Sequence, residues 1–203
     1  MNAEKMKLNS LKKFDQDAPD YESTSDGQFC ARAYPAILEE LNRGGPQAIL
    51  DVGCGPGILL SGASTGSRLY GIDLSANMID EARKKLGDRA ELAVGDAEKL
   101  PWREELFDTV LCTFSFHHYP NPDGVLSEMR RVLKTGGRLI LADPWLPSPF
   151  LQLLNLIIRY SRDGDIHEYS KKEIETLLRS NGFQISTYRH PAPDSFLLTA
   201  IKG

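Results

Sequence analysis

Cysteine is scarce in this chain of 203 residues, which has only Cys30, Cys54 and Cys112. These three lack the paired spacing of a metal or redox motif, and their odd number suits free thiols in a reducing cytoplasm. A disulfide-stapled secreted fold is therefore not expected. We also predict no metal site.

Long apolar runs and an excess of positive charge are missing as well. The longest apolar stretch, Phe150 to Ile158, is far shorter than the roughly 18 residues needed to cross a bilayer. Met1 to Lys13 is too charged for a secretory signal. With a net charge of −4 and scattered Lys and Arg, a broad nucleic-acid surface is not expected. We expect a cytoplasmic protein without a membrane span, whose 41% hydrophobic residues build one core.

What the chain does have is a glycine-rich segment directly after an apolar run, Ala48 to Gly57. The run is typical of a buried parallel strand, and Gly53, Gly55 and Gly57 let the backbone turn tightly and approach a ligand. Asp51 ends the strand, where an acid would repel a pyrophosphate, and the glycine spacing also departs from the dinucleotide fingerprint. The acid instead favours a positively charged ligand. S-adenosylmethionine, which has a sulfonium and an ammonium but no phosphate, fits this requirement.

Two further apolar runs also end in acids. Asp73 follows Asp51 by 22 positions, and Asp96 follows Asp73 by 23. An acid at the second strand end can accept hydrogen bonds from both ribose hydroxyls, although it can equally cap the helix that Ser75 opens. The spacing predicts three carboxylates along one edge of a sheet.

The rest of the chain alternates strands and helices. The first twenty-odd residues are polar and are expected to be loosely held. Helices are predicted over Phe29–Leu41, from Ser75 to Gly87, from Asp123 to Leu133, over Phe150–Tyr160, and from the capping box of Ser170 and Glu173 to Gly182. Later strands are predicted at Phe107–Phe114, Arg138–Ala142, Phe183–Arg189 and Phe196–Ile201. The last two are too close for a crossover helix and must pair antiparallel.

This order predicts an α/β fold, a doubly wound, seven-stranded, mostly parallel sheet with an antiparallel last strand. Residues 28–203 form a single domain, and residues 1–27 form an N-terminal segment that is a mobile cover for the active site.

The ordered set of motifs resembles the class I S-adenosylmethionine-dependent methyltransferases, whose Rossmann-like fold it matches over Gln28 to Gly203. Ala48–Gly57 resembles their motif I. Within that superfamily the chain is most similar to small-molecule methyltransferases of the ubiquinone and menaquinone biosynthesis type. The short motifs that carry this finer likeness are Phe14-Asp15, Ala18, Tyr21-Glu22, Asp73-Leu-Ser-x-x-Met78 and Phe116-His117-His118.

The resemblance implies S-adenosylmethionine as cofactor and a set of residues that contact it. These are Asp51, Gly53, Cys54, Gly55, Gly57, Asp73, Leu74, Met78, Asp96, Ala97, Phe114 and Ser115. The three acids would face the ammonium, the ribose and the adenine amino group in that order. Backbone of residues 53–55 would hold the methionine portion, while Leu74 and Met78 would pack on the adenine. For each residue, ordinary strand-end packing or capping stays open.

Methyl transfer is an in-line displacement, so holding the nucleophile about 3 Å from the methyl carbon supplies much of the rate. Tyr21, Tyr119 and Trp145 are predicted to wall a small-molecule acceptor. If the nucleophile is a neutral hydroxyl or amine, a histidine base helps, and the candidates are His118 and then His117, of which we expect one to face the pocket and the other solvent. The helix from Phe150 is either an apolar lid or a core helix covering the sheet.

Two other functions stay open at this point. A nicotinamide-dependent oxidoreductase would share the fold, but Asp51 and the glycine spacing count against it. A regulatory protein that binds S-adenosylmethionine without turnover would share the whole site. The sequence does not determine the acceptor or the oligomeric state.

Overall fold

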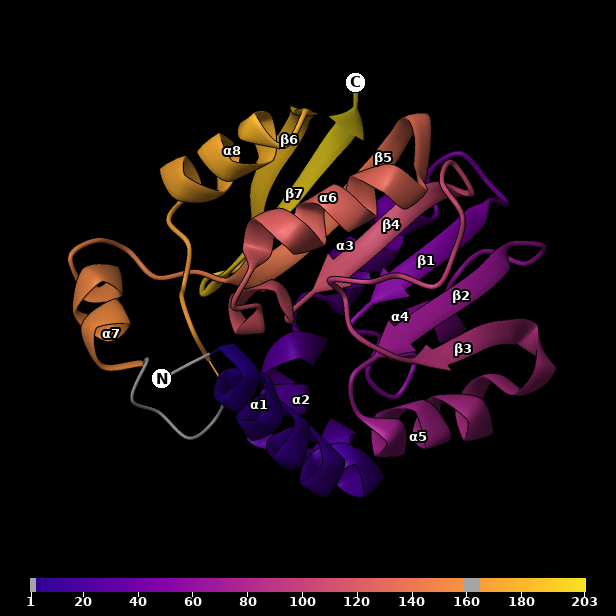
Figure 1. Ribbon diagram of the computed structural model, residues 1–203, viewed down its shortest axis with the longest axis horizontal. Coiled ribbons are helices and arrows are strands. Elements are labelled where there is room, and N and C mark those ends of the chain that lie inside the picture. Colours follow the sequence, from indigo (N-terminus) through magenta and orange to yellow (C-terminus); the bar gives the residue numbers. More distant parts are fainter. Residues whose placement is uncertain (1–2, 159–164) are drawn as a thin grey trace.

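The computed structural model describes residues 3–158 and 165–203, which contain a seven-stranded sheet of order β3-β2-β1-β4-β5-β7-β6 (Figure 1). Its strands are β1 (Ala48–Val52), β2 (Arg68–Asp73), β3 (Ala90–Val94), β4 (Phe107–Thr113), β5 (Leu133–Pro144), β6 (Phe183–Ala192) and β7 (Ser195–Lys202). The first five pair in parallel, whereas β7 is antiparallel to both β5 and β6. The predicted fold is confirmed.

Helices cover both faces of the sheet. The helices α3 (Tyr34–Leu41), α4 (Ile58–Ser61) and α5 (Ala76–Leu86) pack on one face, and α6 (Pro122–Val132) and α8 (Lys171–Ser180) pack on the other. Within β1 the neighbours Ile49 and Leu50 point into opposite layers, and both are fully buried. This is the doubly wound arrangement, in which the carboxyl ends of the parallel strands meet at one edge.

Local capping signals placed the crossover helices correctly. The Ser75 hydroxyl accepts a hydrogen bond from the Met78 N–H at the start of α5, which ends at Gly87 in a positive-φ conformation. The predicted capping box of Ser170 and Glu173 is present at the start of α8.

Two predicted boundaries were wrong. The single helix over Phe29–Leu41 is broken into α2 (Ser25–Ala31) and α3, because Pro35 lacks the N–H that would continue the helix and its ring collides with the preceding turn. Strand β5 begins at Leu133 rather than Arg138, since Gly136 (φ +75°) lets the chain bend while Leu133 still pairs with Phe107.

The N-terminal segment is helical, contrary to the expectation of a loosely held stretch. It forms α1 (Ala3–Asp17) and the 3₁₀ segment η1 (Ala18–Ser23). In Figure 1, α1 and α2 lie beyond the end of the sheet to which the arrowheads of β1 and β2 point. The segment therefore lies where a cover over the carboxyl edge is expected.

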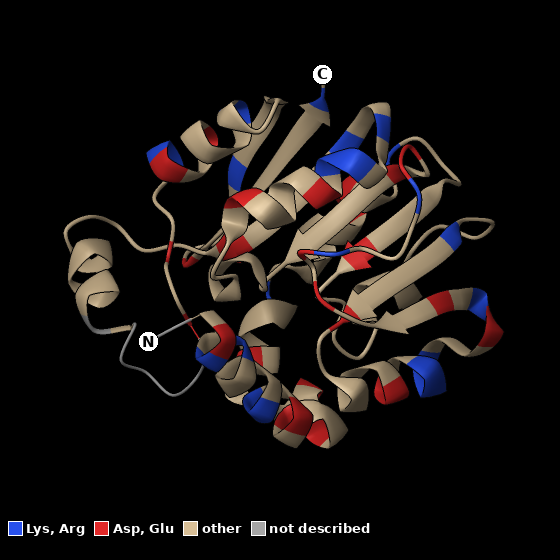
Figure 2. Ribbon diagram, in the orientation of Figure 1, with Lys and Arg blue, Asp and Glu red and all other residues tan. Residues whose placement is uncertain are grey.

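Helix α7 (Phe150–Ile158) stands apart from the sheet and carries no charged residue (Figures 1 and 2). Phe150, Leu153 and Leu156 are exposed, while Leu151 is buried. The alternative of a core helix covering the sheet is therefore wrong. Tyr160, the predicted end of this helix, lies outside the described residues.

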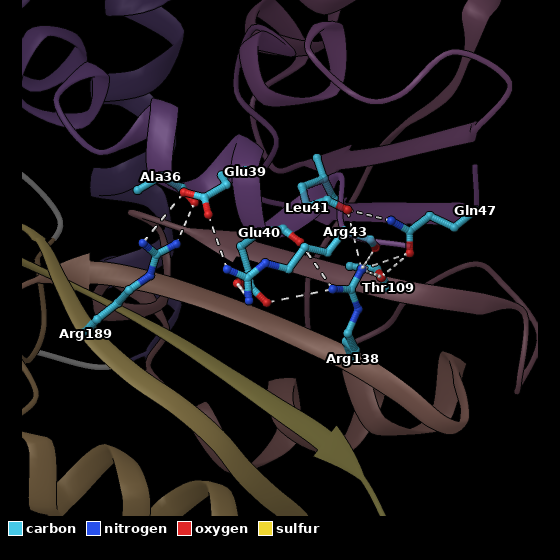
Figure 3. A network of polar contacts seen from close by, with 9 residues as sticks. All are labelled: Ala36, Glu39, Glu40, Leu41, Arg43, Gln47, Thr109, Arg138 and Arg189. Carbon is cyan, nitrogen blue, oxygen red and sulfur yellow. Dashed lines mark hydrogen bonds and ion pairs between the residues drawn. The ribbon is translucent and has the colours of Figure 1, made fainter. Parts of the chain in front are cut away.

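A partly buried polar network fastens the opposite, amino edge of the sheet (Figure 3). The Arg138 guanidinium on β5 donates to the carbonyls of Glu40 and Arg43 and to the Gln47 side chain. These bonds connect the loop after α3 to the beginnings of the strands. The amino edge is thus held by structural contacts, while the predicted site residues lie at the carboxyl edge. Among the described helices, none is long and apolar enough to cross a membrane.

Candidate active site

A cavity of about 980 Å³, which includes its open mouth, lies at the carboxyl edge of the sheet. Strand ends β1, β2 and β4, the turn after β3, and α1 all contribute to its wall. It is lined by the predicted residues Asp51, Gly53, Cys54, Gly55, Asp73, Leu74, Met78, Asp96, Ala97, Phe114, Ser115, Tyr21, Tyr119 and His118. Sequence positions more than sixty residues apart thus meet in one site.

The glycine loop presses against the rest of the site. The N–H groups of Gly53 and Cys54 donate to the Ile72 carbonyl at 2.8 and 3.0 Å, which fixes the loop on β2. Gly53 has φ +76°, and a Cβ there would lie 2.6 Å from the Ser115 side chain. Only glycine therefore fits at this position.

Gly57, which the resemblance also places in contact with the cofactor, is not among the residues that line the cavity, and its contact with the cofactor stays a prediction. A Cβ on it would lie 2.9 Å from Leu86 of α5, so its role is to let α4 and α5 pack closely. Cys54 does line the cavity, and burial raises the pKa of its thiol well above the usual range, so it stays protonated and packs as an apolar group.

Asp51 is the most unusual group in the site. Its side chain is 2% exposed, and among the described residues its Oδ1 atom has no hydrogen-bond partner. Burial, followed by repulsion from Asp73, raises its pKa to about 7. A buried carboxylate oxygen without a donor is costly, and a ligand ammonium would satisfy it. The residues present therefore fit the cationic cofactor that the sequence predicts.

Asp73 has both carboxylate oxygens oriented by backbone. Oδ2 accepts from the Gly55 N–H and Oδ1 from the Ser75 N–H, each at 2.9 Å. Burial raises the pKa of Asp73, although these N–H donors oppose the shift. The residue thus supports the start of α5 and lines the cavity, and each oxygen keeps a second lone pair for a ligand hydroxyl.

Asp96 is bound by a residue that the sequence did not indicate. The Lys7 ammonium on α1 lies 2.6 Å from Asp96 Oδ2 and 2.5 Å from Glu98 Oε1. About two turns further along α1, Asp15 accepts a hydrogen bond from the Ser75 hydroxyl at 2.6 Å. Helix α1 is therefore fastened to the predicted adenine side of the cavity by polar contacts.

The end of β4 forms the floor of the cavity. The Tyr119 hydroxyl donates to Ser115 Oγ, which donates to the Val52 carbonyl at 3.1 Å. Phe114 has φ +52°, a left-handed conformation that costs a bulky residue roughly 1–3 kcal/mol. The strained residue lies beside the position predicted for the sulfonium.

A second cavity, of about 910 Å³ including its open mouth, adjoins the first. The two cavities share Phe14, Tyr21, Cys30, Phe114 and His118. Trp145, one of the predicted acceptor walls, lines the second cavity, Tyr119 the first, and Tyr21 both. Leu154 of α7 also borders the second cavity.

The two histidines do not divide as expected into one facing the pocket and one facing solvent. Both lie in the 3₁₀ turn η3 (Phe116–His118) and both side chains are largely buried. His118 lines both cavities, and the Phe14 ring meets it edge-on with centroids 5.1 Å apart. His117 lines the second cavity only, with Nδ1 2.9 Å from Asp143 Oδ1.

Carboxylates surround this pair. Burial opposes charging of His117, but Asp143, Glu168 and Asp165 outweigh it and raise its pKa well above the usual value. Asp165 Oδ1 lies 3.2 Å from His118 Nδ1; although burial acts in the other direction, the two histidines hold its pKa at about 2. Sequence reasoning missed Asp143, Asp165 and Glu168 as site residues, because no spacing connects them to His117.

Residues 50–141 match the family model for a methyltransferase domain. Over these residues the chain carries a methyltransferase domain. The chain is 36% identical to the demethylmenaquinone methyltransferase of Staphylococcus aureus over 71% of its own length and 62% of the relative. It is 27% identical to that of Thermotoga maritima over 90% and 91%. Other curated relatives are longer, and the chain spans only 34% to 49% of their length.

Solved structures share the methyltransferase fold. The 1,6-didemethyltoxoflavin-N1-methyltransferase of Burkholderia thailandensis, solved with its substrate and S-adenosylhomocysteine, superposes with a TM-score of 0.79 at 19% identity. The match covers 100% of the chain and 91% of that structure. The family to which the domain belongs implies use of S-adenosylmethionine.

Proposed function

We propose that this chain transfers a methyl group from S-adenosylmethionine to a small-molecule acceptor. The observation that carries the proposal is Asp51, a buried acid at a strand end with an oxygen that lacks a donor, facing the same cavity as Asp73 and Asp96. Nicotinamide chemistry is not favoured, because this edge would repel a pyrophosphate.

The cofactor-binding roles follow from the acids and the loop. Asp51 accepts from the ammonium, Asp73 from the ribose hydroxyls and Asp96 from the adenine amino group, with the Ala97 N–H beside it. Backbone of residues 53–55 contacts the methionine portion. Leu74 and Met78 pack on the adenine, and Phe114 and Ser115 border the sulfonium. When bound, the cofactor supplies an electrophilic methyl group.

The acceptor occupies the second cavity, and its reactive atom enters the first cavity where the two share lining residues. Tyr21, Tyr119 and Trp145 hold its body and exclude water, which strengthens electrostatic interactions in the site. His118, which lines both cavities, receives the acceptor proton if the nucleophile is neutral. His117, the neighbouring residue, assists His118 in this role. Residues 28–203 form the catalytic domain and residues 1–27 a mobile cover.

The test is methyl transfer from isotope-labelled S-adenosylmethionine to a panel of phenols, quinols, amines and thiols, followed by mass spectrometry. We expect a methylated product from at least one class and loss of most turnover in His118→Gln, with cofactor affinity retained. The matched control is His167→Gln, which removes a histidine from outside both cavities. Saturable cofactor binding without product on any acceptor would replace the proposal with a regulatory role.

A further inference from the structure

The cluster around His117 has the composition of a metal site. One ligand atom each of His117, His118 and Asp165 lies within 4.8 Å of the others. Asp165 Oδ1 is 3.2 Å from His118 Nδ1 and 3.6 Å from His117 Nε2. Ligands that bind one ion at about 2.1 Å lie roughly 3 to 3.5 Å apart. Both distances from Asp165 to the histidines are close to this separation.

The supporting contacts are those that metal-binding histidines have. Asp143 Oδ1 lies 2.9 Å from His117 Nδ1, an arrangement that leaves Nε2 directed toward Asp165. The Ile166 N–H donates to the His117 carbonyl at 3.0 Å, which holds Asp165 beside the histidines. The loop after α7 and the turn after β4 are thus connected at this point.

The charge around the cluster calls for a cation. Asp143 is 1% exposed and Glu168 6%, and among the described residues neither Asp143 Oδ2 nor Glu168 Oε2 has a hydrogen-bond partner. The described residues lining this cavity include Asp165 and Glu168 but no Lys or Arg. Two imidazoles therefore face three carboxylates at a place where an unbalanced charge is expensive.

We infer that this cluster binds one divalent transition-metal ion, Zn²⁺, through His117 Nε2, His118 Nδ1 and Asp165, with Asp143 orienting His117. In the metal-bound chain His118 is a ligand and does not receive the acceptor proton, so the base role given to it under the proposed function applies only to the metal-free chain. Imidazole ligands suit such ions, and three protein ligands leave a coordination position open toward the second cavity. The inference goes against the prediction of no metal site, which rested on cysteine and on spacing, whereas these ligands are brought together only by the fold.

The first experiment is metal titration of the full chain without an affinity tag, after removal of metal with a chelator. Calorimetry with Zn²⁺ should show one site per chain, and Co²⁺ in its place should give visible absorption bands of a low-coordinate site. Mg²⁺, which prefers oxygen ligands, should not compete.

Variants then locate the ion. His118→Ala and Asp165→Asn should remove the stoichiometric site, and Asp143→Asn should weaken it about 10- to 100-fold, as for other residues that orient a ligand histidine. The matched control is His167→Ala, whose imidazole comes from the same loop but pairs with Glu173. It should bind Zn²⁺ and Co²⁺ as the wild type does.

Failure of wild-type protein to bind Zn²⁺ or Co²⁺ stoichiometrically overturns the inference, as does unchanged binding in both His118→Ala and Asp165→Asn. Because metal binding is measured without cofactor or acceptor, this result is independent of the proposed methyl transfer. A chain that binds the ion but transfers no methyl group would sink only the proposed function.

Discussion

Asp51 carries a free-energy cost that makes sense only with a ligand. An acid whose pKa is raised by burial destabilises the folded state once it ionises, because the unfolded chain releases that proton more readily. Its neighbour Asp73 adds repulsion rather than a donor. Ionised Asp51 therefore lowers the stability of the fold, and a bound cation would offset this cost.

The first prediction concerns Asp51→Asn and pH. The folded pKa of about 7 lies above the ordinary 3.8, so the folded state holds the extra proton between these values and the Asp51 contribution to stability falls as pH rises through them. Asp51→Asn should therefore gain roughly 2 to 4 kcal/mol in unfolding free energy over wild type between about pH 4.5 and about pH 7.5. Urea unfolding at both pH values measures this. A difference that does not grow with pH would mean that Asp51 is not a desolvated acid.

The second prediction concerns Gly53→Ala. The new Cβ meets Ser115 at 2.6 Å and Tyr119 Oη at 3.1 Å, so the loop must shift from the position in which we propose that it contacts the cofactor. We expect at least a tenfold loss of S-adenosylmethionine affinity by calorimetry, about 1.4 kcal/mol. Gly44→Ala is the control, because Gly44 shares the positive φ but has open space around its Cβ position. Equal effects of the two substitutions would assign the loss to backbone strain alone.

At the scale of elements, α1 lines the cavity, and we propose that it controls access to it. Its polar contacts to the rest of the site are the ion pairs of Lys7 and the hydrogen bonds of Asp15 to Ser75 and Asn77, which are partly exposed and individually worth about 1 kcal/mol or less. The Phe14 ring adds a contact with His118. Because these polar contacts can break one at a time, we expect α1 to open and close during ligand exchange.

The third prediction follows from this attachment. Lys7→Met should raise both the association and the dissociation rate constants of S-adenosylmethionine about two- to fivefold, because the cover opens more often, with a smaller change in Kd. Stopped-flow fluorescence measures both rates. Lys12→Met, an exposed lysine of the same helix, should leave them unchanged. Slower dissociation in Lys7→Met would show that Lys7 competes for Asp96 instead of holding a cover.

The sequence predicted some of these helices and not others. Helices α5 and α8 were predictable because Ser75 and Ser170 cap them locally and an apolar stripe packs on the sheet. Helix α1 was not, since it is polar and its contacts are made by Lys7 and Asp15 to residues far along the chain. The one sequence signal in α1 was the pair Phe14-Asp15, which matches a motif of the family that the chain resembles.

At the scale of the whole molecule, the predictable part of the site is the part built from a repeated pattern, an acid at the end of a parallel strand. Asp51, Asp73 and Asp96 follow successive parallel strands, and topology alone brings them to one edge. The second cavity joins η1, α2, η3 and the chain after β5, and no period relates these segments. Asp143, Asp165 and Glu168 could therefore not be connected to His117 before the fold was known.

Isothermal titration of the purified chain with S-adenosylmethionine, and separately with NADH, tests most directly whether the acidic edge holds a cationic methyl donor. We predict saturable binding of one S-adenosylmethionine per chain, no saturable heat with NADH, and at least tenfold weaker binding, about 1.4 kcal/mol, when Asp51 and Asp73 are both replaced by alanine. Saturation with NADH alone, or an affinity for S-adenosylmethionine that the double replacement leaves intact, would contradict the account.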